Sequence, residues 1–477
     1  MLTLEEPISV VLIRFILNNK IVSTDLPPGN LLVDFIRYEQ NLKGTKIGCR
    51  EGDCGACVVL VGEIKNGELQ YQSLTSCLTP LANVHNKHVV TVEGINMQPL
   101  NLIQQAMTDE AATQCGFCTP GFVMSFAGFC LSRKECTYES AIASVDGNIC
   151  RCTGYKSIER AAARIVHGLT GRGTQEPCRF AVDNNILPSY FFNIQEEIAK
   201  LSSATNGELQ KNDDGTIISG GTDLYVQKHD ELRFSGNRYV FNHKVLKGIY
   251  MEGGMCFLGA STTVTDLAES SVMQESFPRL NQYIKLISST PIRNIATIAG
   301  NFINASPIGD LTVFFLALDA TLVLSDGNRT RELPLRKLYK GYKILDKLPG
   351  EYIEKIFFEL PGNYTSFHFE KVSKRTYLDI ASVNTAILIK VENGKIAQVH
   401  LSAGGVAPVP LYMEDTVAFL KGKPLRDETI RQAVEVIQTE ISPISDVRGT
   451  EKYKRLLLSQ LFKAHFVELF NLTPSLF

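Results

Sequence analysis

Residues 46–60, KIGCREGDCGACVVL, place three cysteines and three glycines on one short segment. Cys49, Cys54 and Cys57 follow the spacing C-x4-C-x2-C, and Cys77 is the next cysteine along the chain. This is the plant-type ligand pattern of a [2Fe–2S] cluster. The glycines allow positive φ angles, so the backbone can fold around a compact inorganic core and point amide groups at its sulfurs. The stretch therefore predicts an iron–sulfur loop.

Two other interpretations of this loop carry less weight. Cys54 and Cys57 could form half of a zinc knuckle, but the additional Cys49 and the density of glycines fit zinc poorly. A thioredoxin-type redox pair would open a helix, whereas Cys57 leads directly into the strand-like run CVVLVGEI. The cluster remains the interpretation that accounts for all three cysteines.

The sequence around this loop predicts a small β-grasp domain. Asn18-Asn19 and Asn66-Gly67 are hairpin signals between alternating apolar runs. We expect strands at 8–17, 20–25, 57–65, 68–73 and 88–92, with one helix at 31–42. Together with the cluster loop, these elements predict a ferredoxin-like [2Fe–2S] domain over residues 1–90.

A second cysteine set follows in residues 91–169. Cys115 and Cys118 stand at C-x2-C spacing, and Cys150 and Cys152 at C-x-C spacing. The apolar periodicity predicts helices at 101–113, 122–131, 138–145 and 158–169. Cysteine turns at helix ends place backbone N–H groups and helix dipoles beside a negatively charged thiolate cluster. We expect a four-helix domain that binds a second [2Fe–2S] cluster.

The composition bounds the function classes. A chain of 477 residues predicts several domains. With 48 basic and 50 acidic residues, the chain has no excess of positive charge that would attract nucleic acid. No signal peptide or membrane-spanning run is evident, so we expect a cytoplasmic protein with no membrane partner. Because cytosolic thiols are kept reduced, its twelve cysteines indicate metal ligation rather than a disulfide framework.

The two cysteine sets together resemble a known family. CGFCTPGF at 115–122 and CRCTGY at 150–155, downstream of GCREGDCGAC at 48–57, are similar to the iron–sulfur portion of the molybdenum hydroxylases, the xanthine dehydrogenase and aldehyde oxidase group. The resemblance implies that all eight cysteines are cluster ligands and that the second cluster faces the molybdenum cofactor of a partner. It also places Gln114 and Cys152 on turns that approach the pterin.

Beyond a predicted linker, two stretches of the sequence indicate a flavin site. Residues 170–187 are rich in glycine, proline and charge and predict a linker. TIISGGTDL at 216–224 predicts a strand, a glycine turn and a helix, an arrangement that suits a pyrophosphate but that alone is more often structural. RNIATIAGNFINASPIGD at 293–310 mixes small and polar residues where a core helix would carry Leu and Val, so a polar ligand is expected.

Both stretches resemble the FAD-binding domain of the same family, which we place at residues 188–355. The resemblance assigns two groups to FAD: Ile217, Ser219, Gly220, Gly221, Thr222 and Asp223 at the pyrophosphate and ribose, and Thr297, Gly300, Asn301, Asn304, Ser306 and Asp310 in the rest of the pocket. Asp310 is expected to hold a ribityl or ribose hydroxyl. Ile287 departs from the pattern, since animal relatives carry an aromatic residue there beside the flavin.

Residues 356–477 predict a C-terminal α+β domain of the FAD module, of the kind found in flavin reductases. We expect strands at 366–372, 381–392 and 395–403 and helices at 426–441 and 453–470. By resemblance, Lys371 lies near the flavin, where a cation would stabilise the anionic reduced ring. Leu378 stands where animal dehydrogenases carry an acidic residue that tunes NAD access.

The expected fold class is therefore a multidomain α+β protein with two [2Fe–2S] domains and an FAD module. The resemblance implies an electron-transfer subunit of a xanthine dehydrogenase, which passes electrons through two [2Fe–2S] clusters to FAD and then to NAD+ during oxidation of hypoxanthine and xanthine to urate. Hydroxylation would take place on a molybdopterin-binding large subunit, in a heterodimer or a dimer of heterodimers. We assign no general base in this chain.

Three alternatives remain open on the sequence. The partner could hydroxylate an aldehyde or another N-heterocycle, because no residue here touches substrate. The chain could act alone as an iron–sulfur flavoprotein that oxidises NADH. It could also be a regulatory scaffold that has lost its cofactors, although all eight ligand positions are cysteine.

Overall fold

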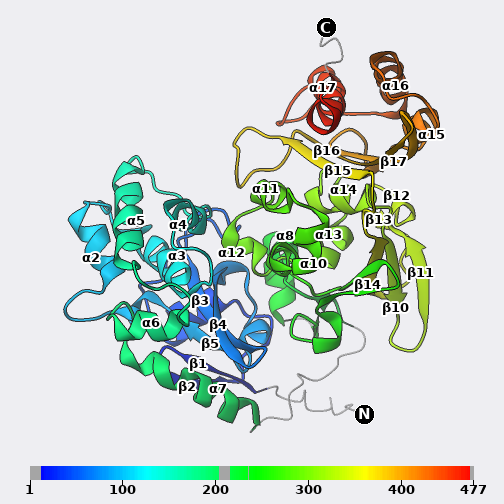
Figure 1. The fold of residues 1–477 in the computed structure, drawn as a ribbon. Helices are drawn as coiled ribbons and strands as arrows, with labels where there is room; N and C mark the ends of the chain where they lie inside the picture. Colours follow the sequence, from blue (N-terminus) through cyan, green and yellow to red (C-terminus); the bar gives the residue numbers. More distant parts are fainter. Residues whose placement is uncertain (1–11, 204–214, 235, 473–477) are drawn as a thin grey trace, which may run out of the picture. The chain divides into compact units, whose positions relative to one another are not determined.

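The computed structural model describes residues 12–203, 215–234 and 236–472, and the chain divides into two compact units (Figure 1). The first unit runs to Tyr239 and also takes in Ser289–Ile295. The second holds Val240–Ser288 and the chain from Ala296 onward. Both units combine helices with sheets, which confirms the α+β class. The predicted strand at 8–17 begins outside the described residues.

The first unit contains a mixed five-stranded sheet of order β2-β1-β5-β3-β4. Only β1 and β5 pair in parallel, and Asn66 and Gly67 turn the chain between β3 and β4 with φ angles of 52° and 82°. The predicted helix at 31–42 is shorter than expected, a three-residue helix α1 followed by a π turn. The elements are β1 (Ile13–Leu17), β2 (Lys20–Thr24), α1 (Leu32–Asp34), the π turn Phe35–Glu39, β3 (Val58–Lys65), β4 (Glu68–Thr75) and β5 (His88–Val90).

Four helices follow in the same unit: α2 (Leu102–Asp109), α3 (Thr119–Leu131), α4 (Tyr138–Ser144) and α5 (Lys156–Gly168). Helix α3 is buried on most of its surface and packs against β3 and β4 as well as against α2 and α4. Phe122 and Phe126 of α3 lie in one core with Val58 and Leu60 of β3. The two predicted iron–sulfur domains therefore share a hydrophobic core.

The segment predicted as a linker, residues 170–187, is instead packed structure. It contains α6 (Pro177–Asp183), in which Phe180 and Val182 are buried in the same core as α3. The Glu176 side chain accepts hydrogen bonds from the first backbone N–H groups of this helix. The linker prediction was wrong because Pro177 stands at the first helical position, where proline begins a helix rather than breaking one.

Four further elements of the first unit come from the stretch predicted to bind FAD. They are β6 (Ile217–Ile218), which pairs in parallel with β7 (Arg238–Tyr239), the connecting helix α8 (Thr222–Phe234), and the short helix α12 (Thr290–Arg293). Helix α7 (Ile194–Ser203) precedes them and packs on Ile16 of β1. The predicted domain 188–355 is therefore divided between the two units.

The second unit begins with an antiparallel five-stranded sheet of order β11-β10-β14-β9-β8. Phe302, Phe314, Phe315 and Phe358 are fully buried in the core beside this sheet. Its elements are β8 (Ile249–Glu252), β9 (Met255–Gly259), α9 (Val264–Glu269), α10 (Ser271–Ser276), α11 (Leu280–Lys285), α13 (Ile298–Asn304), α14 (Asp310–Leu316), β10 (Thr321–Ser325), β11 (Thr330–Pro334), a small hairpin of β12 (Tyr339–Gly341) and β13 (Ile344–Leu345), and β14 (Tyr352–Glu359).

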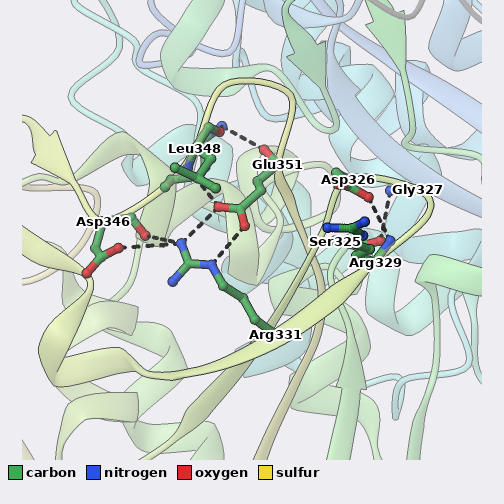
Figure 2. A network of polar contacts seen from close by, with 9 residues as sticks. Ser325, Asp326, Gly327, Arg329, Arg331, Asp346, Leu348 and Glu351 are labelled. Atoms are coloured by element: carbon green, nitrogen blue, oxygen red, sulfur yellow. Dashed lines mark hydrogen bonds and ion pairs between the residues drawn. The ribbon is translucent and has the colours of Figure 1, made fainter.

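A polar network ties β11 to the loop before β14 (Figure 2). Arg331 donates to both carboxylate oxygens of Glu351, at 2.8 and 2.9 Å, and to the backbone oxygen of Asp346 at 3.0 Å. Glu351 also accepts from the backbone N–H of Leu348 at 2.7 Å. The guanidinium of Arg331 lowers the pKa of Glu351 below its usual value.

The second unit ends with a four-stranded antiparallel sheet and three helices. Helix α14 packs on β16 and β17, and the Ser402 hydroxyl donates to the Val313 carbonyl at 2.6 Å, so this sheet shares α14 with the preceding one. No helix within the described ranges is long and apolar enough to cross a membrane. The elements are β15 (Thr365–Val372), β16 (Val383–Glu392), β17 (Lys395–Gly404), β18 (Leu411–Tyr412), α15 (Glu414–Leu420), α16 (Asp427–Glu440) and α17 (Glu451–Phe470).

Candidate functional site

The first cysteine set forms two pairs at one end of the ferredoxin-like sheet. A hydrogen bond between Cys49 and Cys54 lowers the pKa of Cys49 to about 5 and raises that of Cys54. A second bond, between Cys57 and Cys77, lowers the pKa of Cys57 and raises that of Cys77. Cys57 precedes β3 directly and Cys77 follows β4, so the antiparallel pairing of these strands brings the two thiols together.

The second set also forms two pairs, at the ends of helices. Burial and a hydrogen bond with Cys150 raise the pKa of Cys118, at the start of α3, to about 12. A hydrogen bond with Cys115 raises the pKa of Cys152. The sulfur of Cys150 also lies 3.1 Å from the Thr153 hydroxyl. Cys115 and Cys152 are exposed, whereas Cys150 is buried.

This pairwise arrangement fits the donor set of two-iron clusters. In the parts of the chain that the structure describes, no three His, Cys, Asp or Glu side chains gather closely enough to hold one metal ion. A [2Fe–2S] cluster instead takes two thiolates on each of its two irons. Two thiol pairs in each of two loops match that requirement better than the single tetrahedral site of zinc.

The two cysteine loops are bonded to each other. The Ile149 backbone N–H donates to the Cys54 carbonyl at 3.0 Å. The Asn148 side chain donates to the Gly55 carbonyl at 3.2 Å and accepts from the Ser125 hydroxyl at 2.7 Å. Gly55 has a φ of +68°, and a Cβ there would lie 2.4 Å from the Gly147 carbonyl oxygen. The approach of the loops therefore requires glycine.

Helix α12 is bound to both loops. The buried Arg293 forms an ion pair of 2.5 Å with the half-buried Asp146, four residues before Cys150. The Thr290 backbone N–H donates to the same carboxylate at 2.7 Å. On the side of the first loop, a Cβ at Gly52 would lie 2.6 Å from the Ile292 side chain. A piece of the predicted FAD region thus touches the turns that carry both cysteine sets.

The predicted pyrophosphate turn, Ser219 to Asp223, lies in the first unit between β6 and α8. Gly221 has a φ of +81°, and a Cβ there would lie 2.9 Å from the ring of Tyr225. Ser219 and Thr222 are half-buried and Asp223 is exposed. The turn leads into α8, which is kinked at Lys228, and a glycine turn of this kind can direct successive backbone N–H groups at a phosphate. The residues present fit a pyrophosphate.

The residues predicted around 297–306 lie in the second unit, on α13 and the turn after it. Several already have structural hydrogen bonds: the Thr297 hydroxyl accepts from the Gly300 N–H at 3.2 Å, and the Asn301 side-chain oxygen accepts from the Thr312 N–H at 3.1 Å. Asn304 accepts from Lys343. The turn at Ser306 holds a weaker bond, in which its hydroxyl accepts from the Ile308 N–H at 3.4 Å. Their contact with FAD remains a prediction.

Asp310 and Lys371 are brought together in the second unit. The Lys371 side chain is 1% exposed, and its Nζ donates to Asp310 at 2.7 Å and to the Leu286 carbonyl at 2.7 Å. The other Asp310 oxygen accepts from Asn384 at 2.6 Å. An ammonium has three donors and each carboxylate oxygen has two lone pairs, so both groups keep capacity for a flavin and a hydroxyl.

The positions that depart from the family pattern differ in their surroundings. Ile287 is 5% exposed and packs in the core of the second unit. Leu378 lies in the loop after β15 with a φ of +48° and is half-buried. No local sequence pattern marks Asn384, Asp146 and Arg293 as site residues, because each bonds to a partner at least 74 residues away in the sequence.

Four family descriptions match successive parts of the chain. They are "2Fe-2S iron-sulfur cluster binding domain" over residues 15–82, "[2Fe-2S] binding domain" over 91–163, "FAD binding domain in molybdopterin dehydrogenase" over 196–361 and "CO dehydrogenase flavoprotein C-terminal domain" over 368–469. Their order is the order predicted from the cysteine spacing and the two glycine-rich stretches. Two [2Fe–2S] clusters and FAD are therefore the cofactors of these domains.

Curated relatives match nearly the whole chain. Xanthine dehydrogenase of Emericella nidulans is 29% identical over 87% of this chain, and xanthine dehydrogenase/oxidase of Mus musculus is 26% identical over 96%. The chain spans 35% and 39% of the length of these two relatives. The similarity therefore covers both the cysteine-bearing and the flavin-binding regions of the chain.

Solved structures match about half of the chain. A Cu,Mo-CO dehydrogenase in its cyanide-inactivated form is 25% identical with a TM-score of 0.50, covering 53% of this chain and 88% of its own. The carbon monoxide dehydrogenase of Hydrogenophaga pseudoflava that lacks the Mo-pyranopterin moiety is 26% identical with a TM-score of 0.50, covering 56% and 91%. With two cluster domains followed by an FAD module, the chain matches the iron–sulfur and flavin subunit of the molybdenum hydroxylases.

Proposed function

We propose that this chain is the electron-transfer subunit of a xanthine dehydrogenase, serving the oxidation of hypoxanthine and xanthine to urate. The observation that carries the proposal is the match of proteins named xanthine dehydrogenase over 87% to 97% of the chain. Those matches extend across the cysteine sets and the FAD module in one polypeptide. The matches named CO dehydrogenase extend over only 53% to 56%.

The residues of this chain hold and separate the redox groups. When bound, the clusters carry single electrons and FAD exchanges single electrons for pairs, the chemistry that joins a molybdenum centre to NAD+. Four thiol pairs bind the irons, the turn at 219–223 receives the pyrophosphate, and Lys371 with Asp310 offers a cation and an acceptor to the flavin and its ribityl chain. None of these residues is assigned as a general base.

The proposal includes a partner and an acceptor. A large subunit binds molybdopterin and the purine, and the two chains associate as a heterodimer or as a dimer of heterodimers. NAD+ accepts the electron pair. Twelve free cysteines, eight of them assigned as ligands, support a reducing compartment such as the cytoplasm.

Purification with the partner tests this function directly. The complex should oxidise hypoxanthine and xanthine with NAD+ faster than it oxidises aldehydes. Cys118→Ser should remove the second cluster and purine oxidation while leaving the transfer of electrons from NADH to a dye. Loss of both activities in a folded variant would contradict the assigned order of the redox groups.

A matched pair of glycine variants tests the flavin site. Gly221→Val places a side chain at a φ of +81° against Tyr225 and should empty the site, measured as FAD bound per chain. Gly67→Val is the control, because it has a φ of +82° in the β3–β4 turn with no neighbour within 4 Å. Stoichiometric FAD in the Gly221 variant would remove this turn from the site.

A second candidate function is the same role in a different molybdenum hydroxylase. The similarity to CO dehydrogenase chains favours it, because their flavin portion shares this fold. A complex that oxidises an aldehyde, another N-heterocycle or carbon monoxide, and not purines, would support it. Diaphorase activity without any stable partner would instead indicate a stand-alone NADH oxidoreductase, and a purified protein without iron–sulfur and flavin absorption bands would indicate a scaffold.

A further inference from the structure

Asn83 is a residue of the ferredoxin-like portion that contacts the predicted pyrophosphate turn. It lies in the 3-10 turn Leu81–Val84, six residues after Cys77, and is 3% exposed. Its side-chain amide donates to the Ser219 carbonyl oxygen at 3.0 Å. Both residues belong to the first unit, so this bond joins a cluster-ligand segment to the flavin turn within one compact body.

The bond fixes the orientation of one peptide group in the turn. In a trans peptide, the C=O of Ser219 and the N–H of Gly220 point in opposite directions. Holding the carbonyl toward Asn83 therefore directs the Gly220 N–H away from the ferredoxin-like portion. An N–H fixed in this way is a preorganised donor for a phosphate oxygen, because it does not have to rotate on binding.

A second contact with the ferredoxin-like portion lies at the far end of α8, the helix that follows the turn. Arg233, in the last turn of α8, donates to the Asn30 side chain at 2.6 Å. Asn30 in turn accepts from the Leu81 backbone N–H through its own carbonyl at 2.9 Å, so it is bonded to the turn that carries Asn83. The ferredoxin-like portion thus contacts both the turn before α8 and the end of that helix.

A shared core links this contact to the first cluster. Cys57, Cys77, Leu78, Ile218 and Tyr225 are buried in one hydrophobic cluster. A cluster held by Cys77 would restrain the segment that continues into the Leu81–Val84 turn. A restraint on that turn holds the amide of Asn83 at the Ser219 carbonyl.

We propose that Asn83 is a positioning residue for FAD, and that it couples assembly of the first cluster to flavin binding. The inference rests on the proposed FAD site at residues 217–223. It adds a residue outside the FAD-binding region to that site. Because coupling between two sites is reciprocal, loss of the cluster should weaken FAD binding and loss of FAD should weaken cluster retention.

The affinity for FAD tests the positioning role. In the full chain with both clusters, Asn83→Leu removes the donor and Asn83→Asp replaces it with an acceptor of the same shape, so each should weaken FAD binding about tenfold, equivalent to one hydrogen bond. Asn101→Leu is the matched control, because Asn101 is 1% exposed and donates to the Ile95 carbonyl at 2.7 Å without contacting the turn. Its FAD affinity should stay within twofold of the wild type.

A double variant tests the coupling. Cys77→Ser should weaken FAD binding, and adding Asn83→Leu should weaken it little further if the cluster acts through Asn83. Additive effects would overturn the coupling, and FAD affinities within twofold of the wild type in both Asn83 variants would overturn the positioning role. Absence of FAD binding by the wild-type chain would contradict the proposed FAD site itself, which keeps the two failures distinguishable. Asn83→Asp serves as the test if Asn83→Leu does not fold.

Discussion

The two cysteine loops have the same number of thiols but different surroundings. In the first loop, Cys57 and Cys77 are each 2% exposed and lie in a hydrophobic core. In the second, Cys115 and Cys152 are exposed. Reduction potentials of iron–sulfur clusters depend on solvent exposure and on hydrogen bonds to sulfur. Equal ligand sets in unequal environments therefore predict two clusters with different potentials and different access to a partner.

The difference originates in what packs on each loop. Ile292 of α12 and Leu78 lie against Gly52 of the first loop, so that glycine is enclosed. Around the second loop, Phe117 and Ile149 are 46% and 41% exposed. The family resemblance places the second cluster nearest to a partner chain. In the proposed complex, that chain is the molybdopterin-binding subunit.

The largest expected effect is on FAD content, which should fall when a cysteine of the first loop is replaced and stay unchanged when one of the second loop is replaced. Cys57→Ala should remove the first cluster and lower FAD content, because Cys57 shares its core with Ile218 and Tyr225 of the flavin segment. Cys115→Ala should remove only the second cluster, because Cys115 is exposed. Iron and FAD per chain, together with the electron paramagnetic resonance of the reduced protein, check this. Equal FAD content in the two variants would contradict the asymmetry.

The ion pair beneath the second loop should have the next largest effect. Arg293→Ala leaves the half-buried Asp146 without its cation and should lower the free energy of unfolding by about 2 kcal/mol. Arg179→Ala, which breaks an exposed pair with Asp183, is the control and should change it by less than about 1 kcal/mol. Chemical denaturation measures both. A loss of the same size in the two variants would show that Arg293 does not support the loop.

The free energy of unfolding should depend on pH through His88, which lies in the sheet beside the first loop. Burial lowers the pKa of His88, on β5, to about 3. The unfolded chain then binds a proton near pH 6.5 that the folded chain does not, so stability is complete above that pH and falls as the pH decreases. The loss should reach about 2 kcal/mol at pH 5.

His88→Gln should remove this part of the pH dependence. His167→Gln, at an exposed position near the end of α5, should leave it unchanged. Urea unfolding at pH 7 and pH 5 measures the difference for each variant. An unchanged slope in His88→Gln would show that the imidazole is not the titrating group.

The smallest effect concerns the contact between the loops. Ser125→Ala removes the donor to Asn148, whose amide bonds to Gly55, and should lower stability by about 1 kcal/mol. Ser132→Ala, which removes a bond to the Phe129 carbonyl at the end of α3, is the control for loss of a serine hydroxyl in the same helix. Only the Ser125 variant should also shift the signals of both clusters in the reduced protein.

Local patterns made much of the fold predictable. The predicted helices at 122–131 and 426–441 correspond to α3 and α16 within a few residues, because an apolar periodicity requires only neighbouring side chains. The assignment of the eight cysteines as ligands rests on the same kind of local signal, a short and fixed spacing, and it stays a prediction. The strand pairs around Asn66-Gly67 and Asn393-Gly394 follow from turn residues that tolerate positive φ.

Long-range packing was not predictable in this way. The core shared by the two iron–sulfur domains depends on α3 being apolar on nearly all sides, and sequence motifs alone do not show such a shared core. The short helices α9 to α11 of the second unit have six residues each, too few to show a helical period. Asp146 and Arg293 lie 147 residues apart, so their pairing appears only in the folded chain.

The return of α12 to the first unit has a consequence for dissecting the protein. Since the backbone passes from one body to the other, comes back for seven residues and leaves again, no single cleavage point separates the cluster-bearing body from the rest. A fragment ending at Tyr239 would lack the Ile292 side chain that lies against Gly52, and it would leave Asp146 without its cation. Fragments designed for separate expression would have to carry the α12 sequence twice, or supply it as a peptide.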